Sequence, residues 1–213
     1  MYLPAHFAES RPEVLRAFIG TNPLGLLVTQ NRAGGLDANN VPFVLDFADD
    51  GAPGVLRAHV ARANPLWSSA RDDVEALVAF QGPHGYVSPA WYPSKAEHGK
   101  VVPTWNYVMV QARGRLRAID DRAWLRAFVT RLTETHEASR PAPWAVSDAP
   151  ADYIETMLGA IVGIEIALTS LAGKWKVSQN RDAADRAGVA AGLLRERGDA
   201  PLAAEVSAPG GGR

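Results

Sequence analysis

Four of the chain's six tryptophans lie in short strings that also carry amides, cations or hydroxyls, most of them with Gly or Pro alongside. The strings occupy residues 59–67, 80–92, 102–107 and 173–181. A flat heteroaromatic ligand with a charged tail requires apolar ring faces, a few fixed hydrogen-bonding groups and an anion clamp. These groups recur at four separated points of the chain, which indicates one binding site assembled from distant segments.

The first string combines a strand end with a helix start. Asn64-Pro65 is typical of an N-cap followed by Pro at the first helical position, and His59 and Trp67 flank it. Backbone N–H groups at a helix N-terminus bind anions, and Arg62 would add a charge-assisted contact to a phosphate. The alternative is that Asn64 only caps the helix while Arg62 is solvated. Taken alone, the string favours the cap.

The second string places Gln81 and Gly82 at a predicted strand end. Glycine permits close approach of the backbone to a ligand, and glutamine offers both a donor and an acceptor. The alternative is a plain hairpin turn at residues 83–85, which is somewhat favoured.

The third string follows a proline that holds its neighbour extended. Strand alternation would send Trp105 and Tyr107 to one face, and Thr104 and Asn106 to the other. A ligand-facing polar pair and a solvent-facing pair fit this pattern equally well.

The fourth string has Lys174 and Lys176 on either side of Trp175, followed by Ser178-Gln179-Asn180-Arg181. As a charge run alone it would be solvated surface. As the edge of a ligand site it supplies cations, amides and a hydroxyl within a few residues.

Composition excludes several other chemistries. The 213 residues include no cysteine, so disulfides, thiolate metal sites and thiol nucleophiles are ruled out. The net charge of −1 offers no general attraction for nucleic acid or an anionic membrane. The five histidines lack metal-ligand spacing, so no metal is expected. No acid pair or nucleophile motif identifies a catalytic residue. Neither a secretion signal nor a membrane-spanning run is recognisable, so a cytoplasmic location is expected.

Apolar periodicity predicts a mainly β chain with inserted helices, an α+β class in which a small β-barrel is favoured. Strands are expected at residues 24–30, 41–47, 55–60, 74–80, 85–91, 107–119 and 161–168, with residues 37–40 irregular, 49–54 a turn and 81–84 a connection. Helices are expected after Ser10, Asn64 and Asp120, near residues 150–158, and from about 182 to 197. We expect one domain over residues 1–198 and a disordered tail over 199–213.

Taken together, the four strings resemble those of the PaiB-type family of FMN-binding negative transcriptional regulators. The matching motifs are His-x-x-x-x-Asn-Pro-x-Trp, Phe-Gln-Gly-Pro-His-x-Tyr-x-Ser-x-x-Trp-Tyr, Val-Pro-Thr-Trp-Asn-Tyr and Lys-x-Ser-Gln-Asn-Arg. They occur here in that order, together with a Met-Tyr-x-Pro start and Ile161-Val-Gly163, so the likeness covers residues 1–197.

The resemblance implies an FMN-binding split β-barrel that forms a homodimer with FMN at the subunit interface. It implies a ribityl phosphate beside residues 59–67 and the isoalloxazine edge near Gln81 and Gly82. The implied cofactor-binding residues are His59, Arg62, Asn64, Trp67, Gln81, Gly82, Thr104, Trp105, Asn106, Lys176, Ser178, Gln179, Asn180 and Arg181. One departure is Asn40, which stands where the family carries histidine, so acid–base capacity is lost there.

Two functions compete. The first is that of a non-enzymatic FMN-binding transcriptional regulator, as the family name states, although the sequence contains no recognisable helix-turn-helix. The last predicted helix carries four arginines, Arg181, Arg186, Arg195 and Arg197, but also the acidic residues Asp182, Asp185 and Glu196. This mixed charge favours a neutral helix packed on the protein over a helix that binds DNA. The second is a flavin-dependent oxidoreductase, in which Lys176 would stabilise the anionic reduced flavin at its N1 and O2 edge. Haem or another planar ligand is a third alternative for the pocket.

Overall fold

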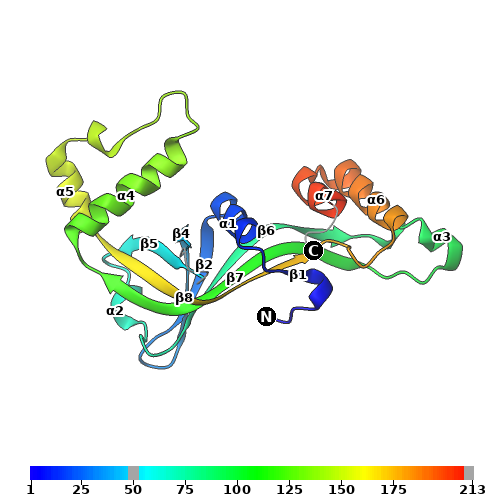
Figure 1. Ribbon diagram of the computed structural model, residues 1–213, viewed down its shortest axis with the longest axis horizontal. Coiled ribbons are helices and arrows are strands. Elements are labelled where there is room, and N and C mark those ends of the chain that lie inside the picture. The colour runs from blue at the N-terminus through cyan, green and yellow to red at the C-terminus, as the bar shows by residue number, and fades with distance from the viewer. Residues whose placement is uncertain (48–52, 209–213) are drawn as a thin grey trace. The chain divides into compact units, whose positions relative to one another are not determined.

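Within residues 1–47 and 53–208, which this computed structural model describes, eight strands form one antiparallel sheet (Figure 1). The order is β3-β2-β6-β7-β8-β5-β4, and the short β1 pairs with β8. The strands are β1 Ala8–Glu9, β2 Leu24–Gln30, β3 Leu36–Pro42, β4 Val44–Asp46, β5 Val55–Ala61, β6 Ala76–Val87, β7 Thr104–Ile119 and β8 Ile161–Lys176. The predicted fold class, a split β-barrel with inserted helices, is confirmed.

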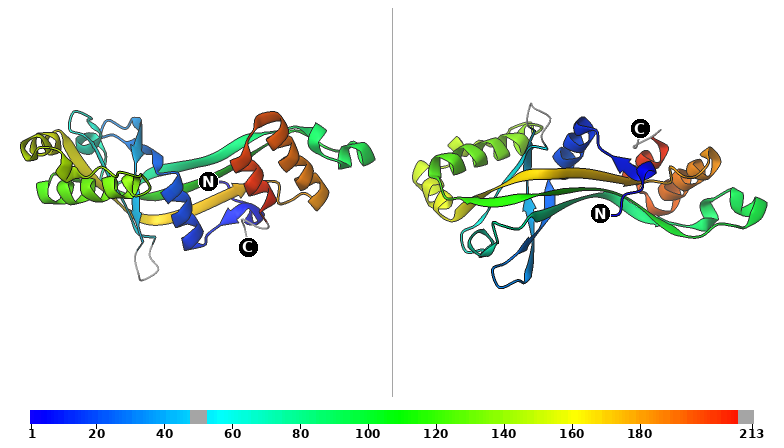
Figure 2. Two further views of the ribbon diagram at one scale, coloured as in Figure 1. Left: turned by 90° about the horizontal axis from the view of Figure 1, so that it is seen from above. Right: turned by 60° about the horizontal axis from the view of Figure 1, so that its bottom comes forward.

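The helices lie between the strands and after the last one (Figure 1; Figure 2). They are α1 Pro12–Thr21, α2 Leu66–Ser69, α3 Ser94–His98, α4 Arg122–Glu137, α5 Ala151–Gly159, α6 Ala183–Gly192 and α7 Ala200–Ser207, with short turns η1 Ala5–Phe7, η2 Pro89–Trp91, η3 Val146–Asp148 and the π-type η4 Leu193–Arg197. Within the described residues, no helix combines the length and apolarity needed to cross a membrane.

The chain clusters into two compact units, each with its own segments. The first unit comprises Met1–Phe18, Phe80–Gln111 and Ala172–Arg213, and the second comprises Ile19–Ala79 and Ala112–Leu171. A single domain over residues 1–198 stays a prediction.

Alternating burial explains why the strands form. In β5, Leu56, Ala58 and Val60 are buried while the residues between them are partly exposed. The apolar run Val162–Ile166 at the start of β8 is buried throughout, although it contains Glu165.

Several predicted boundaries are wrong, and in each case pairing extends a strand. Residues 37–40 belong to β3, where Asp37 pairs with Thr29 and Asn39 with Leu27, because the β2 ladder outweighs their weak strand preference. Likewise, Gly82 and Pro83 lie within one continuous β6 instead of a connection. A Cβ at Gly82 would stand 2.6 Å from the Phe18 ring, so glycine is needed for the strand to pass α1.

Two further differences concern the chain's second half. β7 begins at Thr104 and β8 continues to Lys176, so the last four residues of the third string and the first four of the fourth lie inside strands. The prediction of a disordered tail is wrong for Ala200–Ser207, which form α7 because Leu202, Ala203 and Val206 are buried. The predicted turn at residues 49–54 lies largely outside the described residues.

Candidate functional site

The third and fourth strings meet in the first unit, where the start of β7 lies beside the end of β8. The ammonium of Lys176 donates to the Thr104 hydroxyl and to the Trp105 carbonyl, both at 2.6 Å. Two residues further along each segment, the Asn106 amide donates to the Ser178 hydroxyl at 2.8 Å, and both side chains are buried. Five of the fourteen predicted site residues are therefore brought together by direct contacts.

Two more cations lie in the same unit. Lys174 is only 6% exposed, yet its ammonium has neutral partners: the Tyr2 carbonyl at 2.9 Å and the rings of Tyr2 and Tyr107, each 5.4 Å away. The guanidinium of Arg181 lies 4.9 Å from the centre of the Tyr92 ring.

These three cations, which we call the cation cluster, are Lys174, Lys176 and Arg181. Within the described residues, none of them is engaged by a carboxylate. Burial lowers the pKa of Lys176, and the positive charges of Lys174 and Arg181 lower it further. Grouped, partly buried cations that lack a counter-charge create a positive potential suited to an anion.

A tight turn links Lys176 to Arg181. The Val177 N–H donates to the Gln179 side chain at 2.8 Å, the Gln179 amide donates to the Trp175 carbonyl, and the Arg181 N–H donates to the Ser178 carbonyl at 3.0 Å. Asn180, at the tip, is exposed. The turn fixes the spacing between the two cations.

An exposed aromatic surface lies beside the lysine. Trp105 is 48% exposed, although its carbonyl holds Lys176. The rings of His84 and Tyr86 lie 6.2 and 6.3 Å from the Trp105 ring, nearly parallel and edge-on respectively. The second string thus contributes His84 and Tyr86, which the sequence did not single out. Gln81 and Gly82 lie before these two residues in β6, and in the described part of the chain no polar contact joins them to the cation cluster.

The first string belongs to the second unit, and its polar groups already have partners. Arg62 forms a bidentate pair with Asp120 at 2.8 and 2.5 Å and also donates to the carbonyls of Gly159 and Ile161. The hydrogen bond from Arg62 lowers the pKa of Asp120. A phosphate at Arg62 would therefore have to compete with Asp120.

Asn64 and Trp67 have structural contacts. The Leu66 N–H donates to the Asn64 side chain at 2.9 Å, as expected if Asn64 caps the helix. The Asn64 amide in turn donates to the Asn39 side chain at 3.0 Å. The Trp67 indole donates to the Arg62 carbonyl at 2.9 Å. These bonds shape the turn between β5 and α2.

His59 is a neighbour of the apolar core of the second unit. Its ring lies 5.9 Å from Phe128, which stacks on Trp124 at 5.2 Å. Burial lowers the pKa of His59, and its Nδ1 has no hydrogen-bond partner among the described residues. A neutral imidazole fits this environment.

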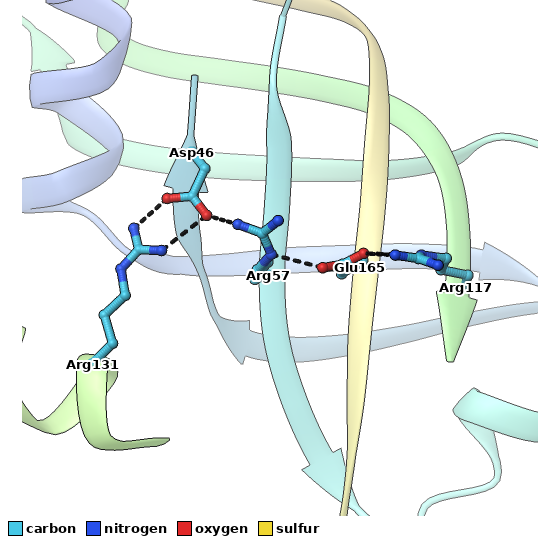
Figure 3. Close-up of polar contacts among 5 residues, drawn as sticks. All are labelled: Asp46, Arg57, Arg117, Arg131 and Glu165. Carbon is cyan, nitrogen blue, oxygen red and sulfur yellow. Dashed lines mark hydrogen bonds and ion pairs between the residues drawn. The ribbon is translucent and has the colours of Figure 1, made fainter. Parts of the chain in front are cut away.

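A network of ion pairs in the second unit was not predicted (Figure 3). Glu165, 5% exposed, accepts from Arg57 at 2.7 Å and from Arg117 at 2.5 Å, while Asp46 is paired with both Arg57 and Arg131. The available signal was the ionisable residue within the apolar run of β8. The network joins β4, β5, β7 and β8 to α4 and has no predicted role in ligand binding.

Metal binding finds no support in the described ranges, which contain no group of three or more His, Asp or Glu side chains that could hold an ion.

The chain matches known proteins over most of its length. A family model described as "Putative FMN-binding domain" matches residues 1–170. An uncharacterized protein of Aspergillus fumigatus is 37% identical, over 91% of this chain and 90% of that protein. The protease synthase and sporulation protein PAI 2 of Bacillus subtilis is 30% identical, over 92% of this chain and 90% of that protein.

Solved structures share the fold at low identity. The FAD and haem binding protein of Mycobacterium smegmatis superposes with a TM-score of 0.56 at 19% identity, over 88% of this chain and 80% of that chain. The family predicted from the four strings is thereby confirmed, and the chain belongs to the FMN-binding domain family, with a flavin-binding split-barrel fold.

Proposed function

We propose that this protein binds FMN and that the cation cluster is the part of the site that recognises its negative charge. The observation that carries the proposal is the grouping of Lys174, Lys176 and Arg181, partly buried and without an acidic partner among the described residues. Isolated buried cations are unfavourable, so a bound anion would stabilise the folded chain.

The residues present fit FMN in three respects. Its phosphate and the N1 and O2 edge of its ring are acceptors of the kind that lysine and arginine bind. The exposed Trp105 ring offers an apolar face to a planar group. An ammonium has three protons; Thr104 and Trp105 take two of the protons of Lys176, which leaves one for a ligand oxygen or nitrogen. When bound, FMN supplies reversible electron uptake at its isoalloxazine ring.

The chain's own residues have distinct roles in this proposal. Thr104 and the Trp105 carbonyl orient the ammonium of Lys176, and the buried pair of Asn106 and Ser178 holds the turn that carries Arg181. Gln179 fixes that turn, and Asn180 is available at its tip. The residues Gln81 and Gly82, together with His59, Arg62, Asn64 and Trp67, stay predicted members of the site, with Asp120 as the competitor for Arg62.

The functional protein in this proposal is a homodimer that holds FMN at its interface and acts as a negative regulator of the PaiB type. The relative in Bacillus subtilis whose name refers to protease synthesis and sporulation supports the regulatory part. Arg195 lies in η4, the end of the helix considered for DNA binding, and forms an ion pair with Glu196 at 2.7 Å. Glu196 also accepts a hydrogen bond from the Trp91 indole, so part of the positive charge of this segment is neutralised and its acid is held by the rest of the protein. DNA recognition through it is therefore not part of the proposal.

A flavin-dependent oxidoreductase is the second candidate, favoured by the lowered pKa of Lys176 beside the exposed Trp105. Anaerobic mixing of the FMN-loaded protein with NADH or NADPH distinguishes the two. Prompt bleaching of the flavin absorbance supports an oxidoreductase, whereas an unchanged spectrum supports a regulator without turnover.

The binding proposal is tested with Lys176→Met. Loss of one charge-assisted contact is expected to raise the FMN dissociation constant about 10- to 100-fold in titration calorimetry. Lys95→Met is the matched control, because Lys95 is an exposed lysine of α3 and its loss is expected to leave the affinity unchanged. Equal FMN affinities for wild type and Lys176→Met would remove the lysine from the site.

A further inference from the structure

A hydrogen bond joins helix α7 to the end of β8 within the first unit. The indole N–H of Trp175 donates to the carboxylate of Glu205 at 3.0 Å, and the two residues are thirty positions apart in the chain. Trp175 is only 4% exposed. Burial raises the pKa of Glu205, and the hydrogen bond from Trp175 lowers it. A hydrogen bond in such partly dehydrated surroundings is stronger than one exposed to water, so it holds the helix and the strand together.

Trp175 occupies the position between two members of the cation cluster. Lys174 precedes it and Lys176 follows it at the end of β8. Successive side chains of a strand point to opposite faces, so the indole lies on one face and both ammonium groups lie on the other. Any rotation of this strand end that moves the indole therefore also moves the two lysines.

The other contacts of Trp175 hold it from different sides. Its ring lies 5.3 Å from the Phe18 ring, edge-on. A Cβ on Gly173 would stand 2.5 Å from the indole, so the ring lies directly over the strand. Its carbonyl accepts a hydrogen bond from the Gln179 amide, in the turn that leads to Arg181. Glu205 completes this set, because it binds the one polar group of the indole.

Glu205 does not act on the cations through its own charge. The pKa of Glu205 is shifted by burial and by the bond from Trp175, whereas the pKa of Lys176 is shifted by burial and by the charges of Lys174 and Arg181. Neither shift includes a contribution from the other group. An influence of Glu205 on the cluster therefore passes through the indole.

We propose that Glu205 is a positioning residue of the FMN site: by holding the Trp175 indole, it fixes the end of β8 and the placement of Lys174 and Lys176. The inference rests on the proposed binding of FMN by the cation cluster. It adds α7, which lies beyond the residues 1–170 matched by the family model, to the elements that build the site. What the site requires at this position is an acceptor for the indole N–H.

The first test is titration calorimetry with FMN on the full chain. Glu205→Met removes the acceptor and is expected to raise the FMN dissociation constant about 3- to 10-fold, the effect of one lost hydrogen bond. Glu205→Gln keeps a side-chain oxygen that accepts from the indole, so its dissociation constant is expected to stay within about twofold of wild type. A glutamine variant as weak as the methionine variant would overturn the proposal.

A double-mutant cycle tests whether the two residues act as one unit. Trp175→Phe keeps an aromatic ring but removes the N–H, and it is expected to weaken FMN binding as much as Glu205→Met does. The double variant Glu205→Met/Trp175→Phe is expected to bind no more weakly than either single variant, because the same bond is lost in all three. Additive losses of affinity would overturn the proposal.

Glu196→Met is the matched control. Glu196 accepts from the Trp91 indole at 2.9 Å in the same unit, so this variant loses a bond of the same kind, but Trp91 lies in η2 and not in β8. Its FMN affinity is expected to equal that of wild type. A loss equal to that of Glu205→Met would overturn the proposal, because the effect would then report a general loosening of the C-terminal helices.

A measurement on the FMN-free protein separates this inference from the proposed function. Amide hydrogen exchange of residues 174–176 is expected to be about 3- to 10-fold faster in Glu205→Met than in wild type, and unchanged in Glu205→Gln. Unchanged exchange in Glu205→Met would overturn the positioning role even if FMN binds. A wild-type chain that takes up no FMN would instead refute the proposed function, and the exchange rates would still decide whether Glu205 holds the strand end.

Discussion

Ser178 combines an unusual backbone conformation with a buried polar contact. Among the described residues it is the only one other than glycine with a positive φ, at 68°. A side chain in this conformation costs roughly 1–2 kcal/mol, which glycine would avoid. The serine hydroxyl accepts a bond from the buried Asn106 amide, and this bond explains why glycine does not occupy the position.

Two substitutions separate the strain from the hydrogen bond. Ser178→Gly removes both, whereas Ser178→Ala keeps the strain and removes the bond. We therefore expect the Ser178→Gly variant to be more stable than the Ser178→Ala variant. The difference in free energy of unfolding should be about 0.5–1 kcal/mol, because the greater flexibility of glycine in the unfolded chain offsets part of the relieved strain. Both should be less stable than wild type by about 1–3 kcal/mol, because the Asn106 amide is left unsatisfied. Urea denaturation measures all three, and an alanine variant as stable as wild type would contradict the account.

Helix α4 packs on the sheet through a position that admits only glycine. A Cβ on Gly163 of β8 would lie 2.2 Å from the Trp124 ring, which stacks on Phe128 of the same helix. Gly163 is also the strand partner of His59, whose ring contacts Phe128, so the Trp124 indole lies close to the His59 side chain. The glycine is what allows the helix to approach the sheet this closely.

Gly163→Ala is accordingly expected to lower the free energy of unfolding by about 1–3 kcal/mol through displacement of Trp124. Gly20→Ala is the control, because nothing lies within 4 Å of a Cβ there and the residue is helical. That substitution should raise the free energy of unfolding by about 0.4–1 kcal/mol. Thermal denaturation followed by circular dichroism measures both, and a neutral Gly163→Ala would show that α4 does not depend on this contact.

At the scale of elements, the sequence predicted what depends on local pattern and missed what depends on pairing. β2 was predicted at its observed bounds because its apolar periodicity is uninterrupted. Asp37–Asn40 and Gly82-Pro83 carry turn-forming residues, so no local signal shows that partner strands hold them extended. The helix at Ala200–Ser207 was predicted as disordered because a short Ala-rich segment carries no local signal that it is buried; its burial depends on the residues that pack against it in the fold.

At the scale of the molecule, the predicted site divides between the two units. The contacts of Lys176 with Thr104 and Trp105 join residues more than seventy positions apart. The sequence motifs predicted these three residues as members of the site, but they did not predict the hydrogen bonds between them. The roles of Tyr2, Tyr92 and Tyr107 beside the cations were missed, because an aromatic ring near a cation has no sequence spacing. Arg62, in contrast, has a surface acid as its partner, which sequence alone could not identify.

The ion-pair network makes the stability of the second unit dependent on pH. Burial by itself raises the pKa of Glu165, but the hydrogen bonds from Arg57 and Arg117 lower it more, so the net pKa lies below the ordinary value of 4.5. A carboxylate with a lowered pKa stabilises the fold above its unfolded pKa, and this stabilisation is lost as the pH falls through the folded pKa.

Glu165→Gln is therefore expected to lower the free energy of unfolding at neutral pH by about 2–4 kcal/mol, less than for a fully buried pair because Arg117 is largely exposed. The difference from wild type should shrink as the pH falls below 4.5. Glu155→Gln, which removes the exposed pair with Arg126, should cost less than about 1 kcal/mol and serves as the control. A difference that does not change with pH would show that the charge of Glu165 is not what the network uses.

The most direct measurement is the absorption spectrum of the freshly purified chain, followed by denaturation and chromatographic identification of the released compound. The account predicts flavin bands and the release of FMN in an amount equimolar with the chain, or uptake of FMN to that ratio when the protein is purified without it. A colourless protein that takes up no FMN in titration, or one that releases only haem, would contradict the account.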